Sequence, residues 1–264
     1  MNYKKSLGQH FLVDKNIAKK IIKYAQISEN DIVWEIGPGS GILTEQILKN
    51  CNKLIAFEID KQWFDFLKDK LSNPRLRLIN QDILDVDFTK YTKNEKVKVV
   101  ANLPYQITSP IIFKLIESRE LFSSITIMIQ DEVADRIIAK PGCKDYSRLS
   151  IKTQFYFEVK KLFKIPSHLF KPKPKVTSAV IQLIPKDEIT KIKNEELLWK
   201  IIDYTFQHRR KMLRSSLRNY LDKNDYQILM KNTSKSQIDF SRRPEELSIQ
   251  EFINLTDLIS HRKI

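Results

Sequence analysis

The chain has 264 residues, enough for a full hydrophobic core and close to the length at which one domain becomes two. Its 46 basic and 32 acidic residues leave a formal net charge of +14. A positive surface concentrates polyanions, so the charge favours RNA or DNA over an acidic membrane as partner. The alternative is that the many lysines only reflect an AT-rich genome. Cys51 and Cys143 lie far apart, with no Cys-x-x-Cys motif or neighbouring histidine, which indicates free thiols in a reducing compartment and argues against a zinc site.

The first residues of the chain lead into a polar, mixed segment. No apolar stretch in the sequence is long enough for a signal peptide or a membrane span. We therefore expect a cytoplasmic protein that binds neither membrane nor metal, and we expect a monomer.

Short apolar runs alternate with amphipathic segments from residue 31 onward. Residues 31–36 form an apolar run that ends in glycines, and residues 42–48 then show helical spacing. Residues 54–60 repeat the strand pattern. The helix expected after them has an apolar face formed by Trp63, Phe64, Leu67 and Leu71. Further strands are expected at residues 76–79, 97–101, 125–129, 153–159 and 179–183.

This alternation predicts an α/β fold of the Rossmann-like class, because parallel strands need crossover connections and the crossing helices then cover the sheet. We expect a mainly parallel sheet of seven strands. The last two strands, 153–159 and 179–183, are separated by a loop rather than a helix, which predicts an antiparallel hairpin at one edge.

After Pro185 the strand pattern stops. Residues 197–220 and 249–259 are helical by periodicity, and the segment 242–247 breaks the pattern between them. We therefore expect two domains: an α/β domain at residues 1–185 and a small all-helical domain at residues 186–264.

Three of the five glycines, Gly37, Gly39 and Gly41, follow the first strand, where the chain must turn sharply and let a ligand approach its backbone. A dinucleotide fingerprint would have a small third residue where this chain has Ile42. The spacing Gly-x-Gly-x-Gly instead favours S-adenosylmethionine and a class I methyltransferase fold. The alternative is a tight turn without a ligand.

Two acidic residues at later strand ends fit the same cofactor. Glu58 closes the second strand about twenty residues after the loop, where a carboxylate accepts hydrogen bonds from both ribose hydroxyls. Asp82 closes the third strand, where a side-chain oxygen can accept a hydrogen bond from the adenine amine. Either residue alone would be an ordinary solvated acid.

The turn Asn102-Leu103-Pro104-Tyr105 suits methylation of an exocyclic base amine. The Asn102 side-chain oxygen and the Leu103 carbonyl can accept both amine protons and localise the nitrogen lone pair, while Pro104 fixes the backbone. Tyr105 can stack on the base. No strong base is needed, so positioning carries the catalysis. The alternative is a purely structural turn.

A basic loop between the last two strands contains Phe170, Lys171 and Lys173. We expect Phe170 to be exposed and to close over a flipped adenine while the lysines meet phosphates. A phenylalanine this near apolar strands can equally belong to the core.

The expected C-terminal helix carries Arg210, Arg214 and Arg218, which recur every four residues. A positive stripe of this kind can dock RNA through shape and phosphate contacts. The alternative is a solvated charged face. The apolar stripe on a different face is formed by Phe206, Leu213, Leu217 and Tyr220.

Over almost its whole length the chain resembles the small-subunit ribosomal RNA adenine dimethyltransferases of the KsgA type. The matching motifs are Gly8-Gln9-His10-Phe11-Leu12, Glu35-Ile36-Gly37-Pro38-Gly39, Glu58-Ile59-Asp60, Gln81-Asp82, Asn102-Leu103-Pro104-Tyr105, the segment from Phe170 to Val180 and Phe206-x-x-Arg209-Arg210-Lys211.

The resemblance implies that His10 and Leu12 contact the cofactor together with Gly37, Gly39, Glu58, Asp82 and Asn102. Many members have Asn where this chain has His10, so we expect backbone and shape to matter more there than side-chain identity. It also implies dimethylation of two adjacent adenosines in a loop near the 3′ end of small-subunit rRNA, within a nearly assembled subunit. The residues that we expect to contact RNA are Lys171, Lys173, Arg209, Arg210, Lys211, Arg214 and Arg218.

Three alternatives remain open. An Erm-type methylase would modify a large-subunit adenosine with the same chemistry, but Leu103 in place of Ile and Gly8-Gln9 in place of Ser-Gln favour the small subunit. A non-catalytic nucleic-acid factor on this scaffold is disfavoured by the intact turn at residues 102–105. A nicotinamide oxidoreductase is disfavoured by Ile42 and by the lack of a hydride-site constellation.

Overall fold

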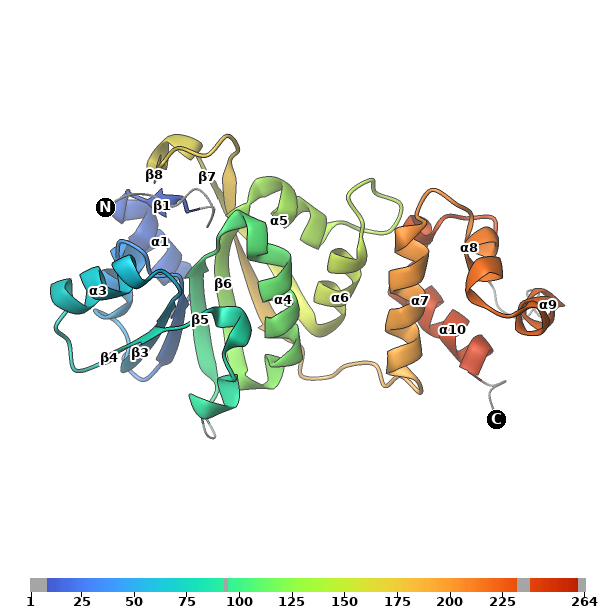
Figure 1. The fold of residues 1–264 in the computed structure, drawn as a ribbon, viewed down its shortest axis with the longest axis horizontal. Helices are drawn as coiled ribbons and strands as arrows, with labels where there is room; N and C mark the ends of the chain where they lie inside the picture. Colours follow the sequence, from blue (N-terminus) through green and yellow to red (C-terminus); the bar gives the residue numbers. More distant parts are fainter. Residues whose placement is uncertain (1–8, 93–94, 232–237, 261–264) are drawn as a thin grey trace. The chain divides into compact units, whose positions relative to one another are not determined.

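A central sheet of seven strands organises the larger part of the chain in the computed structural model, which describes residues 9–92, 95–231 and 238–260 (Figure 1). The strands follow the order β4-β3-β2-β5-β6-β9-β7. Their bounds are Ile32–Ile36 for β2, Lys53–Glu58 for β3, Leu76–Asn80 for β4, Val97–Asn102 for β5, Phe122–Gln130 for β6, Phe157–Ile165 for β7 and Ser178–Pro185 for β9. Gly8 of the N-terminal motif lies outside the described residues.

The strand directions confirm the expected mainly parallel sheet. β2 pairs in parallel with β3 and β5, β3 with β4, and β5 with β6. β9 runs antiparallel to both β6 and β7 and lies between them, so β7 is the edge strand of the expected hairpin. The carboxyl ends of β2, β3, β4 and β5 therefore meet at one edge of the sheet, where ligands bind in open α/β folds.

Side-chain caps define where the first helices begin. The Asp14 side chain accepts hydrogen bonds from the Asn16 and Ile17 amides, both at 2.8 Å, and the Asp60 side chain accepts one from the Gln62 amide at 3.1 Å. The helices in this part are α1 (Lys15–Tyr24), α2 (Ile42–Ile47), α3 (Lys61–Lys70), α4 (Thr108–Glu117) and α5 (Asp131–Ile138). A core between α1, α2 and the sheet includes Ile21, Ile47, Leu54, Val100 and Val180.

A second, two-stranded sheet joins segments far apart in the sequence, and the sequence pattern did not predict it. β1 (Phe11–Leu12) pairs antiparallel with β8 (Phe170–Lys171), and Leu12 lies opposite Phe170. Both side chains are 2% exposed and belong to the hydrophobic core. The expectation that Phe170 is an exposed loop aromatic is therefore wrong, because strand pairing places it among apolar neighbours.

The strand expected at residues 153–159 was misplaced. Its first four residues belong to helix α6 (Arg148–Tyr156), and β7 starts only at Phe157. The helix is held by tertiary contacts: the Gln154 side chain donates to the carbonyls of Ile137 and Ala139 at 2.7 and 2.8 Å. Burial of both Leu149 and Phe155 adds to this, so packing overrides the strand propensity of the aromatic run.

The chain divides into two compact units. The first comprises residues 1–135 and 156–187, and the second comprises residues 136–155 and 188–264. The chain passes from the first unit to the second for the last time between residues 187 and 188, close to the boundary near residue 186 expected from the sequence. Residues 136–155 were expected in the α/β domain, but they cluster with the helical unit.

The helical unit corrects one expectation. Residues 197–220 do not form one helix, because the chain breaks between α7 (Glu195–Gln207) and α8 (Leu213–Tyr220). The Leu213 amide donates to the Arg242 carbonyl at 2.8 Å and the Arg214 amide to the Phe240 carbonyl at 3.0 Å, so a distant segment caps a new helix start. α9 (Lys223–Lys231) was not expected, whereas α10 (Ile249–Ser260) confirms the last predicted helix.

No helix in the described ranges is long and apolar enough to cross a membrane.

Candidate active site

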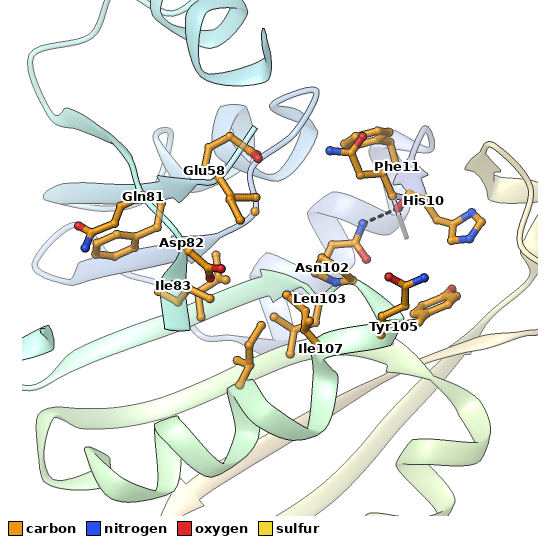
Figure 2. Close-up of a pocket in the computed structure, with 18 residues that line it drawn as sticks. His10, Phe11, Glu58, Gln81, Asp82, Ile83, Asn102, Leu103, Tyr105 and Ile107 are labelled. Atoms are coloured by element: carbon orange, nitrogen blue, oxygen red, sulfur yellow. Dashed lines mark hydrogen bonds between the residues drawn. The ribbon is translucent and has the colours of Figure 1, made fainter. Parts of the chain in front are cut away.

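A pocket lies at the carboxyl ends of β2, β3, β4 and β5, and the segment before β1 completes it (Figure 2). It combines apolar walls with a few polar groups, as ligand sites usually do. Its lining residues are Gln9, His10, Phe11, Ile36, Gly37, Phe57, Glu58, Ile59, Gln81, Asp82, Ile83, Asn102, Leu103, Pro104, Tyr105, Gln106, Ile107 and Ile111.

The glycine loop contributes Gly37 to this pocket, and its backbone adopts conformations that favour glycine. Gly37 lines the pocket with φ of +67°, and Gly39 follows with φ of +52°. A Cβ atom on Gly39 would lie 2.2 Å from the Phe11 ring, whereas one on Gly37 would meet only the Asn102 carbonyl oxygen at 3.8 Å. Gly39 therefore allows Phe11 to close against the loop, and Gly37 leaves backbone open to a ligand.

Glu58 is held rigidly at the end of β3. It is 3% exposed, and its carboxylate accepts hydrogen bonds from the Asp60 amide at 2.9 Å and the Gly39 amide at 3.0 Å. Burial raises the pKa of Glu58 above its ordinary value, and the two amide hydrogen bonds offset part of this rise. Each oxygen keeps acceptor capacity, so the carboxylate can receive further hydrogen bonds from hydroxyl groups of a ligand.

Asp82 follows β4 on the same side of the pocket. Its Oδ1 atom accepts a hydrogen bond from the Leu84 amide at 2.9 Å, which fixes the side chain at the start of a short 3₁₀ turn. Its second oxygen is available to a ligand amine. Gln81 beside it donates to the Asp85 carbonyl at 3.3 Å and also lines the pocket.

The turn after β5 is fixed by a contact with the N-terminal segment. The Asn102 Nδ2 atom donates to the His10 carbonyl oxygen at 2.8 Å (Figure 2). Since the amide nitrogen is used this way, the Oδ1 atom of Asn102 remains as an acceptor for a ligand amine. The Leu103 amide donates to the Met128 carbonyl at 3.1 Å, and the Leu103 residue is 1% exposed, so the backbone of the turn is anchored to β6.

Tyr105 forms the aromatic part of the turn. Its hydroxyl lies 2.6 Å from the Ser178 Oγ atom at the start of β9, and burial raises the pKa of Tyr105 above its ordinary value. The His10 ring stacks on the Tyr105 ring with centroids 5.3 Å apart. The His10 Nδ1 atom lies 2.7 Å from the Pro172 carbonyl oxygen, so Nδ1 carries the proton, because a carbonyl oxygen can only accept.

Glu35 lies behind the glycine loop, on β2, and does not line the pocket. Burial raises the pKa of Glu35 from 4.5 to about 8; the Thr44 hydroxyl offsets part of this rise and the charge of Glu58 adds to it. Neither carboxylate oxygen has a hydrogen bond of ordinary geometry among the described residues. Burial therefore favours the protonated form of Glu35 over the carboxylate.

Most of the expected cofactor and base residues meet in this one pocket. His10, Gly37, Glu58 and Asp82 line it, as does the whole turn at residues 102–105. Leu12, Gly39 and Phe170 do not. Leu12 and Phe170 face the core, and the Gly39 amide supports Glu58 from behind.

Several lining residues were not singled out from the sequence. Phe11 is the main one: its ring packs against Trp63 with centroids 4.6 Å apart and closes over Gly39. Its place in the motif at residues 8–12 could have identified it. Nothing in the sequence marks Ile83, Ile107 and Ile111 as pocket residues, because an isoleucine in an apolar run is expected in the hydrophobic core.

The residues expected to bind RNA are mostly exposed. Arg214 and Arg218 lie on the exposed side of α8, and Arg210 and Lys211 lie in the turn before it. Lys171 and Lys173 are exposed in and after β8. Arg209 differs, because its guanidinium donates to the Glu245 carboxylate at 2.8 Å and the Lys144 carbonyl at 3.0 Å. Arg209 thus connects three segments of the helical unit.

Within the ranges that the structure describes, no group of three or more His, Cys, Asp or Glu side chains is arranged to hold a metal ion.

Comparisons with known proteins cover nearly the full chain. The family model described as ribosomal RNA adenine dimethylase matches residues 1–261. The protein named ribosomal RNA small subunit methyltransferase A of Clostridium perfringens is 44% identical over 260 residues, which is 97% of this chain and 90% of that protein. The protein of the same name from Shouchella clausii is 42% identical over 264 residues, which is 97% of this chain and 89% of that protein.

Solved structures share the fold. A dimethyladenosine transferase from Plasmodium falciparum superposes with a TM-score of 0.76 at 30% identity, covering 93% of this chain and 95% of that one. The 23S rRNA methyltransferase ErmE superposes with a TM-score of 0.70 at 24% identity, over 95% of this chain and 99% of that one. This comparison shows that the two proteins share a fold.

Proposed function

Because this chain belongs to the ribosomal RNA adenine dimethylase family, we propose that it transfers methyl groups from S-adenosylmethionine to the N6 amine of adenosines in ribosomal RNA. The substrate we propose is a pair of adjacent adenosines in a loop near the 3′ end of small-subunit rRNA, within a nearly assembled subunit. The observation that carries the proposal is the common pocket of the Asn102–Tyr105 turn with Glu58 and Asp82.

The pocket residues fit S-adenosylmethionine. Gly37 exposes backbone in a left-handed conformation, and a Cβ there would narrow the approach. Glu58 would receive the ribose hydroxyls, and the free oxygen of Asp82 would receive the adenine amine. When bound, the cofactor supplies an electrophilic methyl group on a sulfonium. The side chains that would hold it are already fixed by backbone hydrogen bonds, so little ordering remains to be done on binding.

The turn at residues 102–105 would position the target amine. The Asn102 Oδ1 atom is left as an acceptor by the His10 carbonyl contact, and the Leu103 carbonyl supplies the second acceptor. Two acceptors on the two amine protons localise the nitrogen lone pair and orient it. Orientation of this kind lowers the barrier because the reacting atoms are held in attack geometry.

Tyr105 would act through its ring rather than as a base. Its raised pKa keeps the phenol protonated at neutral pH, and its hydroxyl is engaged by Ser178. The ring can stack on an unstacked adenine, a contact of ~1–3 kcal/mol. The alkylated amine is acidic enough to lose its proton to water, so the pocket needs no general base.

The assignment to the small subunit follows the names of the similar bacterial proteins.

The test uses two substrates, small ribosomal subunits that lack the modification and, separately, large subunits. Each is incubated with the enzyme and labelled cofactor, and the labelled nucleotides are mapped. We expect two adjacent dimethylated adenosines in the small-subunit rRNA. Label confined to the large subunit would replace the proposed substrate with that of an Erm-type enzyme, and no label on either would favour a non-catalytic factor.

A further inference from the structure

A hollow on the surface of the α/β unit is lined by residues of α1 and α2 and of the segments that follow each helix, and it shares no lining residue with the pocket described above. Its lining is polar and basic. The residues around it are Lys19, Ile22, Lys23, Gln26, Ile27, Gln46, Lys49 and Asn50.

The lysines at this hollow are not neutralised locally. Lys19, Lys23 and Lys49 are exposed, and none of their ammonium groups forms a hydrogen bond or ion pair within the described part of the chain. The nearby acid Asp31 is already paired with Lys98 at 2.9 Å, and Glu45 with Lys70 at 2.6 Å. The three ammonium groups therefore present uncompensated positive charge around one concavity.

Gln46 gives the hollow a buried polar group. The residue is only 5% exposed, yet it lines the hollow. Among the described residues its side-chain amide has no hydrogen-bond partner, whereas its backbone carbonyl accepts a hydrogen bond from the Asn50 side chain at 2.9 Å. The amide nitrogen of Gln46 keeps its donor capacity, so this group suits a ligand that offers oxygen acceptors.

The backbone at one end of the hollow has an uncommon conformation. Gln26 has φ of +51°, a left-handed value that is uncommon for residues other than glycine. Its carbonyl oxygen accepts a hydrogen bond from the Lys98 side chain at 2.6 Å, which fixes the turn after α1. The hollow is thus bounded by a fixed backbone.

The basic residues also continue toward the active-site pocket. Lys15, Lys19 and Lys23 recur every four residues and lie on one side of α1, about 6 Å apart along its axis. α1 begins four residues after Phe11, which lines the pocket. A polyanion whose loop reaches the pocket could therefore continue along this helix.

We propose that the hollow between α1 and α2 is an accessory binding site for backbone phosphates of the ribosomal RNA substrate. The inference rests on the proposed function, because RNA is the polyanion that the enzyme must hold. Phosphate oxygens match both parts of the site: they pair with the lysine ammonium groups and accept hydrogen bonds from the Gln46 amide.

The test compares charge-matched variants of the full-length protein. The hollow pair is Lys23→Gln with Lys49→Gln, and the control pair is Lys68→Gln with Lys96→Gln, two exposed lysines elsewhere in the same unit. Binding to unmethylated small ribosomal subunits is measured over a range of salt concentrations. The hollow pair should bind the subunits roughly tenfold more weakly than wild type at about 0.1 M salt. Its salt slope, the steepness with which log affinity falls with log salt concentration, should decrease by about 1.5. The affinity of the control pair should stay within about twofold of wild type. Equal behaviour of the two pairs would overturn the proposal.

A third variant separates a built site from a general positive potential. Gln46→Leu removes the amide without changing the charge, so it should weaken RNA binding while the salt slope stays at the wild-type value. Thermal unfolding and cofactor binding should stay close to wild type. Unchanged RNA affinity of a folded Gln46→Leu protein would contradict the site.

Two further arms identify the partner. The binding series is repeated with protein-free small-subunit rRNA; a defect seen only with whole particles would assign the hollow to an acidic ribosomal protein and overturn the RNA proposal. Methylation by the wild-type enzyme tests the proposed function separately. If only large subunits are methylated, the same variants are compared on large subunits, so the hollow is tested in either case.

Discussion

The pocket and the basic surface of the helical unit hold their polar side chains in opposite ways. In the pocket, Glu58, Asp82 and Asn102 are each fixed by a backbone atom of another residue. On the basic surface, Arg210, Arg214 and Arg218 are exposed, and within the described ranges their guanidinium groups form no hydrogen bond or ion pair. Fixed groups suit a reaction that depends on orientation, whereas free cations suit contact with a flexible chain of phosphates.

This contrast predicts that changes in the pocket alter turnover and that changes on the basic surface alter binding. The largest expected effect comes from Asn102→Ala, which removes the side-chain acceptor for the amine. We expect kcat to fall roughly 10²-fold or more, because a misplaced reacting group alone costs about that much. Cofactor affinity, measured by calorimetry, should change far less. Losses of similar size in both would contradict the role of Asn102 in orienting the amine.

Replacement of Tyr105 by Ala and by Phe divides the role of the ring from that of the hydroxyl. Tyr105→Ala removes a stacking surface worth ~1–3 kcal/mol, so kcat/KM should fall roughly 10- to 100-fold. Tyr105→Phe keeps the ring and loses only the contact with Ser178, and it should retain most of the activity. A steep loss in the phenylalanine variant, with a changed pH profile, would point instead to a proton-transfer role for the phenol.

The double variant Arg210→Gln with Arg214→Gln tests the role of the basic surface of the helical unit. Particle affinity should fall roughly tenfold at about 0.1 M salt, and the salt slope should flatten by about 1.5, because two phosphate contacts are removed. In single-turnover assays at saturating enzyme, the rate of methyl transfer should match wild type. If the salt slope is unchanged, these arginines are solvated surface residues.

Glu35→Gln has the smallest expected effect on activity and a defined effect on stability. The raised pKa of Glu35 favours the protonated acid in the folded state, so stability should decline as the pH rises from about 4.5 to about 8. The glutamine variant cannot ionise and should lack this part of the decline. Melting temperatures of both proteins across this range check it; parallel curves would show that Glu35 does not titrate as inferred.

The sequence predicted the pocket better than its surroundings, for physical reasons. Gly37, Glu58, Asp82 and Asn102 stand at the ends of strands with strong apolar patterns, and parallel strands bring their carboxyl ends to one edge. Local spacing was therefore enough to predict that they meet.

Errors arose where long-range contacts decide the outcome. The pairing of β1 with β8 joins residues about 160 positions apart, and it moved Phe170 from an expected loop into the core. The break before α8 depends on carbonyls near residue 240 that the pattern of residues 197–220 does not contain. Local periodicity carries no information about such partners.

The hydrogen bond from Asn102 to residue 10 ends on a main-chain oxygen, which every amino acid possesses. The hydrogen bond that orients Asn102 therefore does not depend on which side chain stands at position 10. A one-residue deletion between Gln9 and Leu12 is a different matter, since it would displace that oxygen by about 3.4 Å. For this hydrogen bond, the length of the segment thus matters more than the identity of the residue at position 10.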